Sequence, residues 1–414
     1  MIYARPAMSP ELIDLEDARR LVLERVPRLP AEEVPLPEAL GRVLAADATA
    51  TEPVPGFDNS AMDGFAVRAA DTAGVAPDSP LGLSVVDESR AGRPAARALG
   101  PGEAIAISTG AILPEGADAV VRVEDTAPAG ARVEVRAEIR PGRDVRRAGE
   151  DVRAGETVLR AGTPLGAVEL GVLASLGLSS ASCPRRPRLC VVTTGDELLA
   201  PGEEPRPGGV RNSIALAVPA LAERAGAEVA TVVTARDEPV ATREAIERAL
   251  DADVAVITGG VSVGEHDHVR SALAELSADE VFWGVALRPG RPTWFGTAPG
   301  GGLVFGLPGN PVSAVVTFLL FARLALRTMC GADPGLERAT ALLVEDYEKR
   351  PGRVHAVGCQ LELHDDGWHA RLTREAPSAH VLTSMLGAEA LAIVPAEAEA
   401  VWAGERVTVE LLPR

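Results

Sequence analysis

The stretch DVAVITGGVSVGEHD, residues 253–267, decides the fold class of this chain. An apolar run ends in Gly259 and Gly260, and a loop containing Ser262 and Gly264 leads into a helical pattern. Glycine lets the backbone approach a ligand closely, and a helix N-terminus attracts anions through its free N–H groups and its dipole. The stretch therefore predicts a strand, a loop that cradles a phosphate or a pterin, and a helix.

The alternation of strand and helix patterns extends on both sides of this stretch, over residues 186–330. Strands are expected at 187–195, 228–234, 253–260, 281–287 and from 303, and helices at 212–224, 238–250, 265–276 and 311–328. Asp237 and Asn310 stand where N-caps of two of these helices are expected. The alternation predicts a parallel, doubly wound sheet, and such sheets bind ligands beyond the carboxyl ends of their strands.

The whole chain predicts an α/β multidomain protein, because 414 residues exceed what one hydrophobic core usually serves. The expected parts are a discontinuous helical and mixed domain (1–49 and 145–185), a β-rich domain (50–144), the doubly wound domain (186–330) and a small C-terminal β-barrel (331–414).

The first of these parts is expected to contain helices. Apolar residues at helical spacing over 11–26 predict an amphipathic helix, with Ser9 as a plausible N-cap. A second helix is expected near residues 38–48, and a third at 166–176.

The charge of the chain limits its partners. The formal net charge is −18, and such a field repels nucleic acid and anionic lipid surfaces, so neither is an expected partner. Lys349 is the only lysine. Any anion site must therefore use arginine or backbone N–H groups, and an anionic small substrate would need arginines focused in a cleft.

The sequence favours a cytoplasmic location. The N-terminal region carries acidic residues and lacks the basic and apolar regions of a signal peptide. The apolar stretch from Pro311 to Ala322 is broken by Arg323 and is too short to span a bilayer. Four dispersed cysteines form no CxxC pair, which fits a reducing compartment and makes a zinc site unlikely.

Carboxylates accompany the loops that follow the strands of the doubly wound domain, TTGDEL (193–198) and TGGVSVGEHD (258–267). Glu197 and Asp267 lie beside glycines, and oxygen ligands of this kind suit Mg²⁺ shared with substrate phosphates. For Asp237, a simple capping role is the favoured interpretation. No Walker lysine is present, which excludes a P-loop ATPase.

Two further groups of side chains are candidate binding residues, and each also has a simpler structural explanation. Arg288 and Arg291 bracket a Pro-Gly turn in LRPGRP (287–292), where they form either an oxyanion site or ordinary exposed charge. His266 and His268 flank Asp267, but a solvated pair in the first helical turn is favoured over a metal site.

Three polar segments precede the doubly wound domain: PGFDNSAMDG (55–64), STGAILPEGADAVV (108–121) and RRAGED (146–151). Each alone could be a structured loop. Together with the strand-end loops they suggest a cleft between domains or subunits.

These three segments, with TTGDEL, TGGVSVGEHD and GLPGNPVSA, occur in the order and rough spacing of the molybdopterin molybdenumtransferases, and the chain resembles that family over essentially its whole length. The family includes the E domain of gephyrin. The resemblance implies an elongated homodimer of four-part subunits, with a doubly wound domain similar to that of molybdopterin adenylyltransferases. It implies a dimerisation role for the discontinuous domain, and an active cleft completed by the partner's β-rich domain.

The reaction that the resemblance implies is transfer of molybdenum. Adenylyl-molybdopterin and molybdate, with Mg²⁺, yield molybdenum cofactor and AMP. Such cleavage needs charge neutralisation more than a protein nucleophile. Molybdopterin adenylyltransferase is then a candidate protein partner.

The resemblance also assigns roles to residues. The implied catalytic residues are Asp63, Thr109, Asp151, Glu197, Asp237 and Asp267, of which Glu197 and Asp267 would hold magnesium. The implied substrate-binding residues are Arg146, Gly259, Gly260, Ser262, Gly264, Arg288, Arg291, Pro308, Asn310 and Pro311.

The sequence departs from the family pattern at several positions. Arg288 and Arg291 replace lysines but keep the positive charge. Gly284 stands where the family usually has lysine, Gly358 where it often has arginine, and Ala379 where it has serine. Because the last two positions are thought to help receive molybdate, Arg353 is a candidate to compensate.

Two alternatives to molybdenum insertion follow. A non-catalytic paralogue would bind the pterin nucleotide and act as a dimeric scaffold; the departures support it, and the intact acidic cluster opposes it. Adenylyl transfer to molybdopterin is opposed by the full four-part chain.

Overall fold

The computed structural model describes residues 12–261, 268–373 and 379–413. The described residues before Val34 and after Ala181 form the first compact unit. Val34–Ala181 form the second unit. The chain passes between the units within β1 (Ala31–Pro35) and β12 (Ser180–Pro184).

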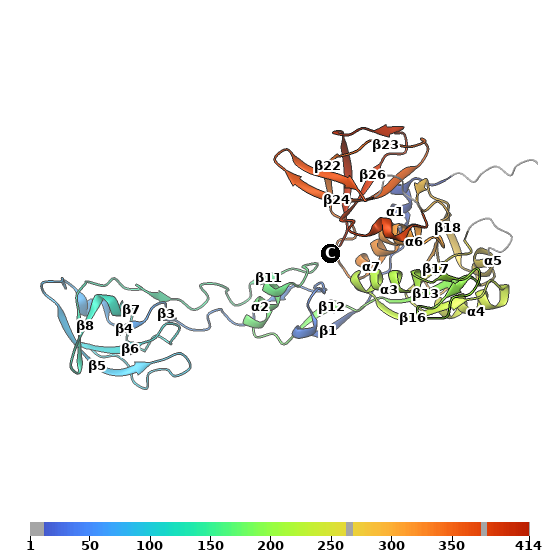
Figure 1. Cartoon of the computed structure of the whole chain (residues 1–414). Coiled ribbons are helices and arrows are strands. Elements are labelled where there is room, and N and C mark those ends of the chain that lie inside the picture. Colours follow the sequence, from blue (N-terminus) through green and yellow to red (C-terminus); the bar gives the residue numbers. More distant parts are fainter. Residues whose placement is uncertain (1–11, 262–267, 374–378, 414) are drawn as a thin grey trace, which may run out of the picture. The chain divides into compact units, whose positions relative to one another are not determined.

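The central sheet of the first unit has six strands in the order β16-β13-β17-β21-β20-β18 (Figure 1). Their bounds are Arg188–Thr194 for β13, Glu228–Ala235 for β16, Val254–Thr258 for β17, Asp279–Trp283 for β18, Trp294–Thr297 for β20 and Leu303–Leu307 for β21. β16, β13, β17 and β21 are mutually parallel, whereas β20 runs antiparallel to both of its neighbours. The expected parallel arrangement therefore holds across the four strands that lead to the candidate loops.

Helices cover both faces of this sheet because side chains alternate along its strands. On β13, Leu189 and Val191 pack in one hydrophobic core with α3 (Ile214–Arg224), and Cys190 and Val192 pack in another core with α4 (Pro239–Ala249) and α5 (His268–Glu275). Full burial of one Val or Leu side chain stabilises the fold by roughly 1.5–3 kcal/mol. The doubly wound architecture is thus a direct result of apolar runs that are buried on both faces.

The expected strand 281–287 is two short strands. β18 ends at Trp283, and β19 (Leu287–Arg288) pairs instead with β24 of the C-terminal sheet. Gly284 lies between them with φ +88°, a backbone conformation that side chains other than glycine rarely adopt. A Cβ there would also come within 3.0 Å of Leu12 Cδ2, so the lysine usual in the family does not suit this position.

Of the two N-caps predicted in the doubly wound domain, one was wrong by one residue and the other was confirmed. Glu238, not Asp237, is the N-cap of α4, because Pro239 is the first helical residue and its predecessor must be extended. Asn310 is the N-cap of the last helical run, although its side chain makes no capping hydrogen bond.

That helical run matches the predicted helix at 311–328 to within one residue. It comprises α6 (Pro311–Thr317), a π-helical turn η4 (Phe318–Ala322) and α7 (Arg323–Met329), and Arg323 does not interrupt it. By length and composition alone it could cross a membrane, but 78% of its apolar window is buried inside the fold. It is therefore a core helix of this domain.

The first helix, α1 (Leu15–Leu23), is shorter than expected. Asp14 is its N-cap and accepts a hydrogen bond from Glu16 N at 2.8 Å, whereas Ser9 lies outside the described residues. Leu15, Ala18 and Val22 are buried in the core that α7 also lines. The helix therefore packs with the central domain rather than with residues 145–185.

The C-terminal part is a closed barrel, as predicted. Its strands are β22 (Arg338–Leu343), β24 (Val354–His364), β25 (Gly367–Leu372), β26 (Ala390–Val394) and β28 (Arg406–Leu411). The pairing of β24 with β26 closes the sheet order β24-β25-β22-β28-β26. The short strands β23 (Tyr347–Glu348) and β27 (Ala400–Val401) pair beside it, and η5 (Leu382–Met385) precedes β26.

The second unit is rich in β structure. Its main sheet has the order β7-β4-β6-β5-β9-β8, with bounds Gly64–Val67 for β4, Leu81–Ser89 for β5, Glu103–Ile107 for β6, Ala119–Arg122 for β7, Thr126–Ala129 for β8 and Arg132–Val135 for β9. Short strand pairs join β3 (Asn59–Ser60) to β10 (Val145–Arg146), and β2 (Ala48–Thr49) to β11 (Thr157–Leu159).

The helices of the second unit match the sequence only in part. The predicted helix at 166–176 is α2 (Ala167–Ser175). The helix predicted near 38–48 was wrong: a 3₁₀ turn, η1 (Leu36–Glu38), stands just before it, and Gly41 at φ +75° turns the chain away.

Candidate active site

A cleft of about 440 Å³ opens at the carboxyl ends of the parallel strands. The three strand-end loops line it together: Glu197 and Leu198 from the first, Gly259, Gly260 and Val261 from the second, and Pro308, Gly309 and Asn310 from the third. The topology explains this convergence, because β13, β17 and β21 are adjacent and parallel. Ser262, Gly264 and Asp267 lie outside the described residues.

Glycine is required where the second loop approaches the first. Gly259 has φ +88°, and a Cβ there would lie 2.7 Å from Thr194 Oγ1 and 2.8 Å from Thr194 O. The third loop approaches as closely, since a Cβ on Gly309 would lie 3.3 Å from Gly259 Cα. A backbone without side chains thus forms this wall of the cleft, so a ligand can approach it closely.

The cleft floor is polar and its hydrogen bonds are satisfied. Asn212 Nδ2 donates to Thr193 Oγ1 at 2.8 Å and to Thr234 Oγ1 at 3.1 Å. Asn212 Oδ1 accepts from Ala215 N at 3.1 Å, which fixes the start of α3. Asn212 is buried and lines the cleft, yet no motif in the sequence singled it out.

Two carboxylates reach this cleft from different loops. Glu197 folds back over Gly195, where a Cβ would lie 2.6 Å from Glu197 Oε2. Asp237 follows β16, and its Oδ2 accepts a hydrogen bond from Asp196 N at 3.3 Å. Asp237 is therefore a cleft residue, not the helix cap that was favoured.

The donor set fits a magnesium ion that is shared with a ligand. Within the described ranges, no group of three or more Asp, Glu, His or Cys side chains could hold a metal ion by itself. Mg²⁺ needs only one or two protein carboxylates when waters and substrate phosphates complete its shell. Glu197 and Asp237 meet that need.

A second pocket of about 330 Å³ adjoins the cleft, because Pro292, Pro308 and Asn310 line both. Arg288, Arg291 and Arg353 line this second pocket, and we call them the arginine triad. Burial, and then the positive charges of Arg288 and Arg291, lower the pKa of Arg353. Among the residues that the structure describes, none of the triad forms an ion pair with a carboxylate, so the pocket carries net positive charge.

The second unit brings together the three polar segments that precede the doubly wound domain. Asp63 Oδ1 accepts hydrogen bonds from Thr109 N at 2.7 Å and Thr109 Oγ1 at 3.1 Å. Arg146 is exposed on β10, which pairs with β3 of the first segment. Asp151 is exposed as well, and its N–H donates to Val54 O at 3.0 Å. These implied site residues therefore gather around one set of loops within the unit.

Comparison with known proteins covers almost the whole chain. Residues 13–177 match the model of the MoeA N-terminal region (domain I and II), 190–328 a probable molybdopterin binding domain, and 340–412 the MoeA C-terminal region (domain IV). Molybdopterin molybdenumtransferase 2 of Mycobacterium tuberculosis is 37% identical over 404 residues, which span 95% of this chain and 98% of that protein. The chain belongs to the molybdopterin molybdenumtransferase family.

Other family members agree. Molybdopterin molybdenumtransferase of a Nostoc species is 34% identical, over 96% of this chain and 94% of its own. The crystal structure of a molybdopterin biosynthesis MoeA protein from Pyrococcus horikoshii superposes with a TM-score of 0.85 at 32% identity, over 97% of this chain and 99% of that one. Within the family, the cleft described above falls in the probable molybdopterin binding domain.

Two departures from the family pattern, Gly284 and Gly358, have structural explanations, and nothing in the structure explains Ala379. A Cβ on Gly358 would lie 3.1 Å from Thr373 Oγ1, 3.2 Å from Met385 Sδ and 3.3 Å from Ala388 Cβ, so the space for an arginine is filled. Ala379 lines the arginine pocket, but its backbone O accepts from Val312 N at 3.1 Å.

A hydroxyl group remains available in the pocket of this family member. Ser313 lies in the first turn of α6, is buried and lines the arginine pocket. Sequence reasoning missed it as a site residue. Its position three residues after Asn310 in GLPGNPVSA was the available signal.

Proposed function

We propose that this protein transfers molybdenum from molybdate to adenylyl-molybdopterin, releasing AMP and forming molybdenum cofactor. One observation carries the proposal: a glycine-walled acidic cleft adjoins a pocket that three arginines line. The cleft suits a pterin nucleotide whose phosphates are neutralised by a metal ion. The pocket suits a tetrahedral oxyanion, because guanidinium groups donate paired hydrogen bonds to oxygen.

Different residues of the chain would bind the nucleotide and the molybdate. Gly259, Gly260 and Asn310 would hold the nucleotide at the strand ends, while Pro308 and Pro311 shape the adjoining wall. The arginine triad and Ser313 would hold molybdate next to the pterin. The dithiolene sulfurs of the substrate are soft ligands that accept the molybdenum.

Glu197 and Asp267 would hold Mg²⁺, with Asp237 beside them. The ion would neutralise charge on the phosphates whose bond is broken. The observation that supports this is the presence of Glu197 and Asp237 in one cleft with the glycine-rich loop.

We further propose that the protein is a cytoplasmic homodimer. Asp63, Thr109, Arg146 and Asp151 of the partner's second unit would complete the cleft. Their convergence on one loop cluster supports the idea, as does the dimer that the family resemblance implies. Molybdopterin adenylyltransferase, which makes the substrate, is then the proposed protein partner.

The decisive test is turnover. Purified protein is mixed with adenylyl-molybdopterin and Mg²⁺, molybdate is titrated, and AMP release and pterin-bound molybdenum are followed. Molybdate-dependent AMP release that is lost in Glu197→Gln would support the proposal. Tight nucleotide binding without AMP release at any molybdate concentration would overturn it and leave a binding scaffold. Glu203→Gln, an exposed acid beyond the first loop, is the matched control.

A further inference from the structure

The indole of Trp283 contacts both ends of the glycine-rich loop. Trp283 is the last residue of β18, and its Nε1 donates a hydrogen bond to Val261 O at 2.9 Å. Arg270, in the first turn of α5, lies with its guanidinium 4.4 Å from the centre of the same ring. Residues 262–267, which join Val261 to α5, lie outside the described residues. One side chain therefore fixes the entry and the exit of this loop.

Arg270 is held against the indole by a second contact. Its Nη2 lies 3.2 Å from Glu280 Oε2, and the same oxygen accepts from Trp294 Nε1 at 2.6 Å. Within the part of the chain that the structure describes, the buried Nε atom of Arg270 has no hydrogen-bond partner. The Arg270 side chain is 38% exposed, and the ring face and Glu280 hold its guanidinium in place.

The same contacts set the wall of the cleft. Val261 lines the cleft and is fully buried, so its carbonyl needs a donor within the protein. Gly260 O accepts from Val269 N at 3.3 Å, which ties the wall to α5. Val261 has no room to shift toward the sheet, since a Cβ on Gly306 would lie 2.9 Å from Val261 Cγ1.

We infer that Trp283 is a positioning residue: its N–H and its ring face hold the two stems of the glycine-rich loop in the geometry that binds the nucleotide. Trp283 does not line the cleft itself. This inference rests on the proposed function for its kinetic consequence. Its structural consequence, a loop stem that opens when the indole N–H is lost, is independent of that function.

Trp283→Phe keeps an aromatic face for Arg270 and removes only the donor to Val261. Trp368→Phe is the matched control, because it makes the same substitution at an exposed position of β25 in the C-terminal barrel. Amide hydrogen exchange, read by mass spectrometry of peptides that contain Val269, reports the stem. Steady-state kinetics with adenylyl-molybdopterin report the cleft.

In Trp283→Phe, we expect Val269 exchange and the KM for adenylyl-molybdopterin each to rise about fivefold or more, the effect of one lost hydrogen bond, with kcat within about twofold. Trp368→Phe should leave both readouts unchanged. Unchanged exchange in Trp283→Phe, or an equal rise in both variants, would overturn the inference. If the wild-type protein shows no turnover, the proposed function fails, and the exchange result still decides the role of Trp283.

Arg270→Gln is the second variant, for the case in which Trp283→Phe folds poorly. It removes the cation over the ring while leaving a polar group near Glu280. We expect faster Val269 exchange in this variant too. Protection equal to that of the wild type would contradict the role of the ring face.

Discussion

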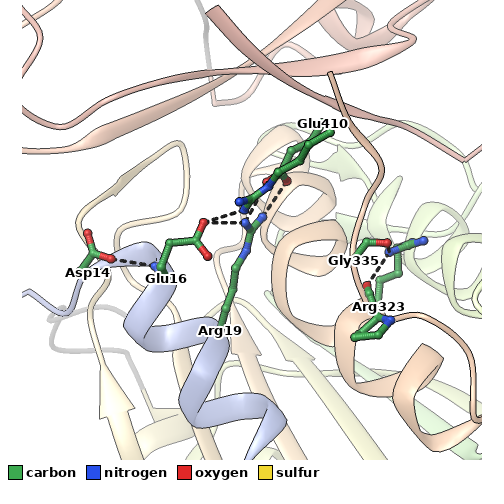
Figure 2. A network of polar contacts seen from close by, with 8 residues as sticks. Asp14, Glu16, Arg19, Arg323, Gly335 and Glu410 are labelled. Carbon is green, nitrogen blue, oxygen red and sulfur yellow. Dashed lines mark hydrogen bonds and ion pairs between the residues drawn. The ribbon is translucent and has the colours of Figure 1, made fainter. Parts of the chain in front are cut away.

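Arg19 and Glu410 form a bidentate ion pair between residues 391 positions apart, with Arg19 Nη1 and Nη2 at 2.8 and 2.7 Å from the two carboxylate oxygens. The pair joins α1 to β28 (Figure 2). Arg338 Nε adds a third hydrogen bond to Glu410 at 3.0 Å. Burial opposes ionisation of Glu410, but the hydrogen bond and charge of Arg19, with the charge of Arg338, hold its pKa below the ordinary value.

Replacement of Arg19 by Met should destabilise the first unit strongly. A buried carboxylate that loses one partner of its ion pair typically costs about 3–5 kcal/mol. Urea unfolding, followed by circular dichroism, measures the change. Arg20→Met is the control, since the pairs of Arg20 with Asp17 and Glu24 are exposed and such pairs contribute about 0–1 kcal/mol. Equal losses of unfolding free energy in the two variants would show that the buried pair contributes no more stability than the exposed pairs.

His355 should make stability depend on pH. Burial, followed by the charges of Lys349, Arg288 and Arg353, lowers the pKa of His355 from 6.5 to about 4. Because the folded state resists protonation, the stabilisation is present above the unfolded pKa of 6.5 and is lost as pH falls towards 4. The loss should reach at most about 3 kcal/mol.

The measurement is urea unfolding as a function of pH across that window. His355→Gln, which cannot titrate, should show a flatter profile than the wild type. His364→Gln, at an exposed position on the same strand, should keep the wild-type slope. An unchanged slope in His355→Gln would assign the acid sensitivity to other groups, such as Glu410.

Gly195→Ala should impair both activity and stability, because Gly195 has φ +153°, which residues other than glycine rarely adopt. The new Cβ would lie within 2.6–2.8 Å of the Glu197 carboxylate, which can swing away because the side chain is exposed and flexible. Displacement of a site carboxylate by about 1 Å can cost roughly 100-fold in rate. The rate of AMP release under saturating molybdate measures the loss of activity. Gly300→Ala is the control, because a Cβ on Gly300 would meet nothing within 4 Å. Full activity in Gly195→Ala would exclude Glu197 from the reaction.

Arg353→Gln should raise the molybdate concentration needed for half-maximal AMP release. A charged hydrogen bond to an oxyanion contributes about 1.5–3 kcal/mol, which corresponds to roughly 10–150-fold. Arg350→Gln removes an exposed cation nearby and should have little effect. If both variants shift the molybdate dependence equally, the contribution of Arg353 is only long-range charge.

Gly358→Arg, which restores the residue often found in the family, should not improve molybdate use. The contacts of 3.1–3.3 Å around its Cβ position predict overpacking, which typically costs about 1–3 kcal/mol. Thermal unfolding and the molybdate titration test this together. A variant of normal stability with tighter molybdate dependence would show that the barrel interior can open.

Much of the central domain was predictable because its signals are local. Apolar runs that end in glycines located the strands, and parallel strands place their following loops at one edge of the sheet. This is why Glu197, Gly259 and Asn310 could be expected together. The barrel followed from β-prone runs alone.

What the sequence could not predict depends on tertiary contacts. The helix predicted near residues 38–48 does not form, because the chain turns at Gly41. The single strand expected at 281–287 is divided at Gly284. All three arginines of the triad were candidates in the sequence, but their meeting in one pocket depends on the pairing of β19 with β24, which are distant in sequence. Asn212 carried no distinctive pattern, and Ser313 carried only its position after Asn310, so their places at the two pockets depend on the fold.

The link between α1 and β28 also has a consequence for synthesis on the ribosome. At roughly 5–20 residues per second, Glu410 emerges roughly 20–80 s after Arg19, given the 391 positions between them. During that interval the apolar face of α1 and the guanidinium of Arg19 lack their final partners. The emergence of Glu410, rather than helix formation, therefore sets the earliest time at which this unit can close.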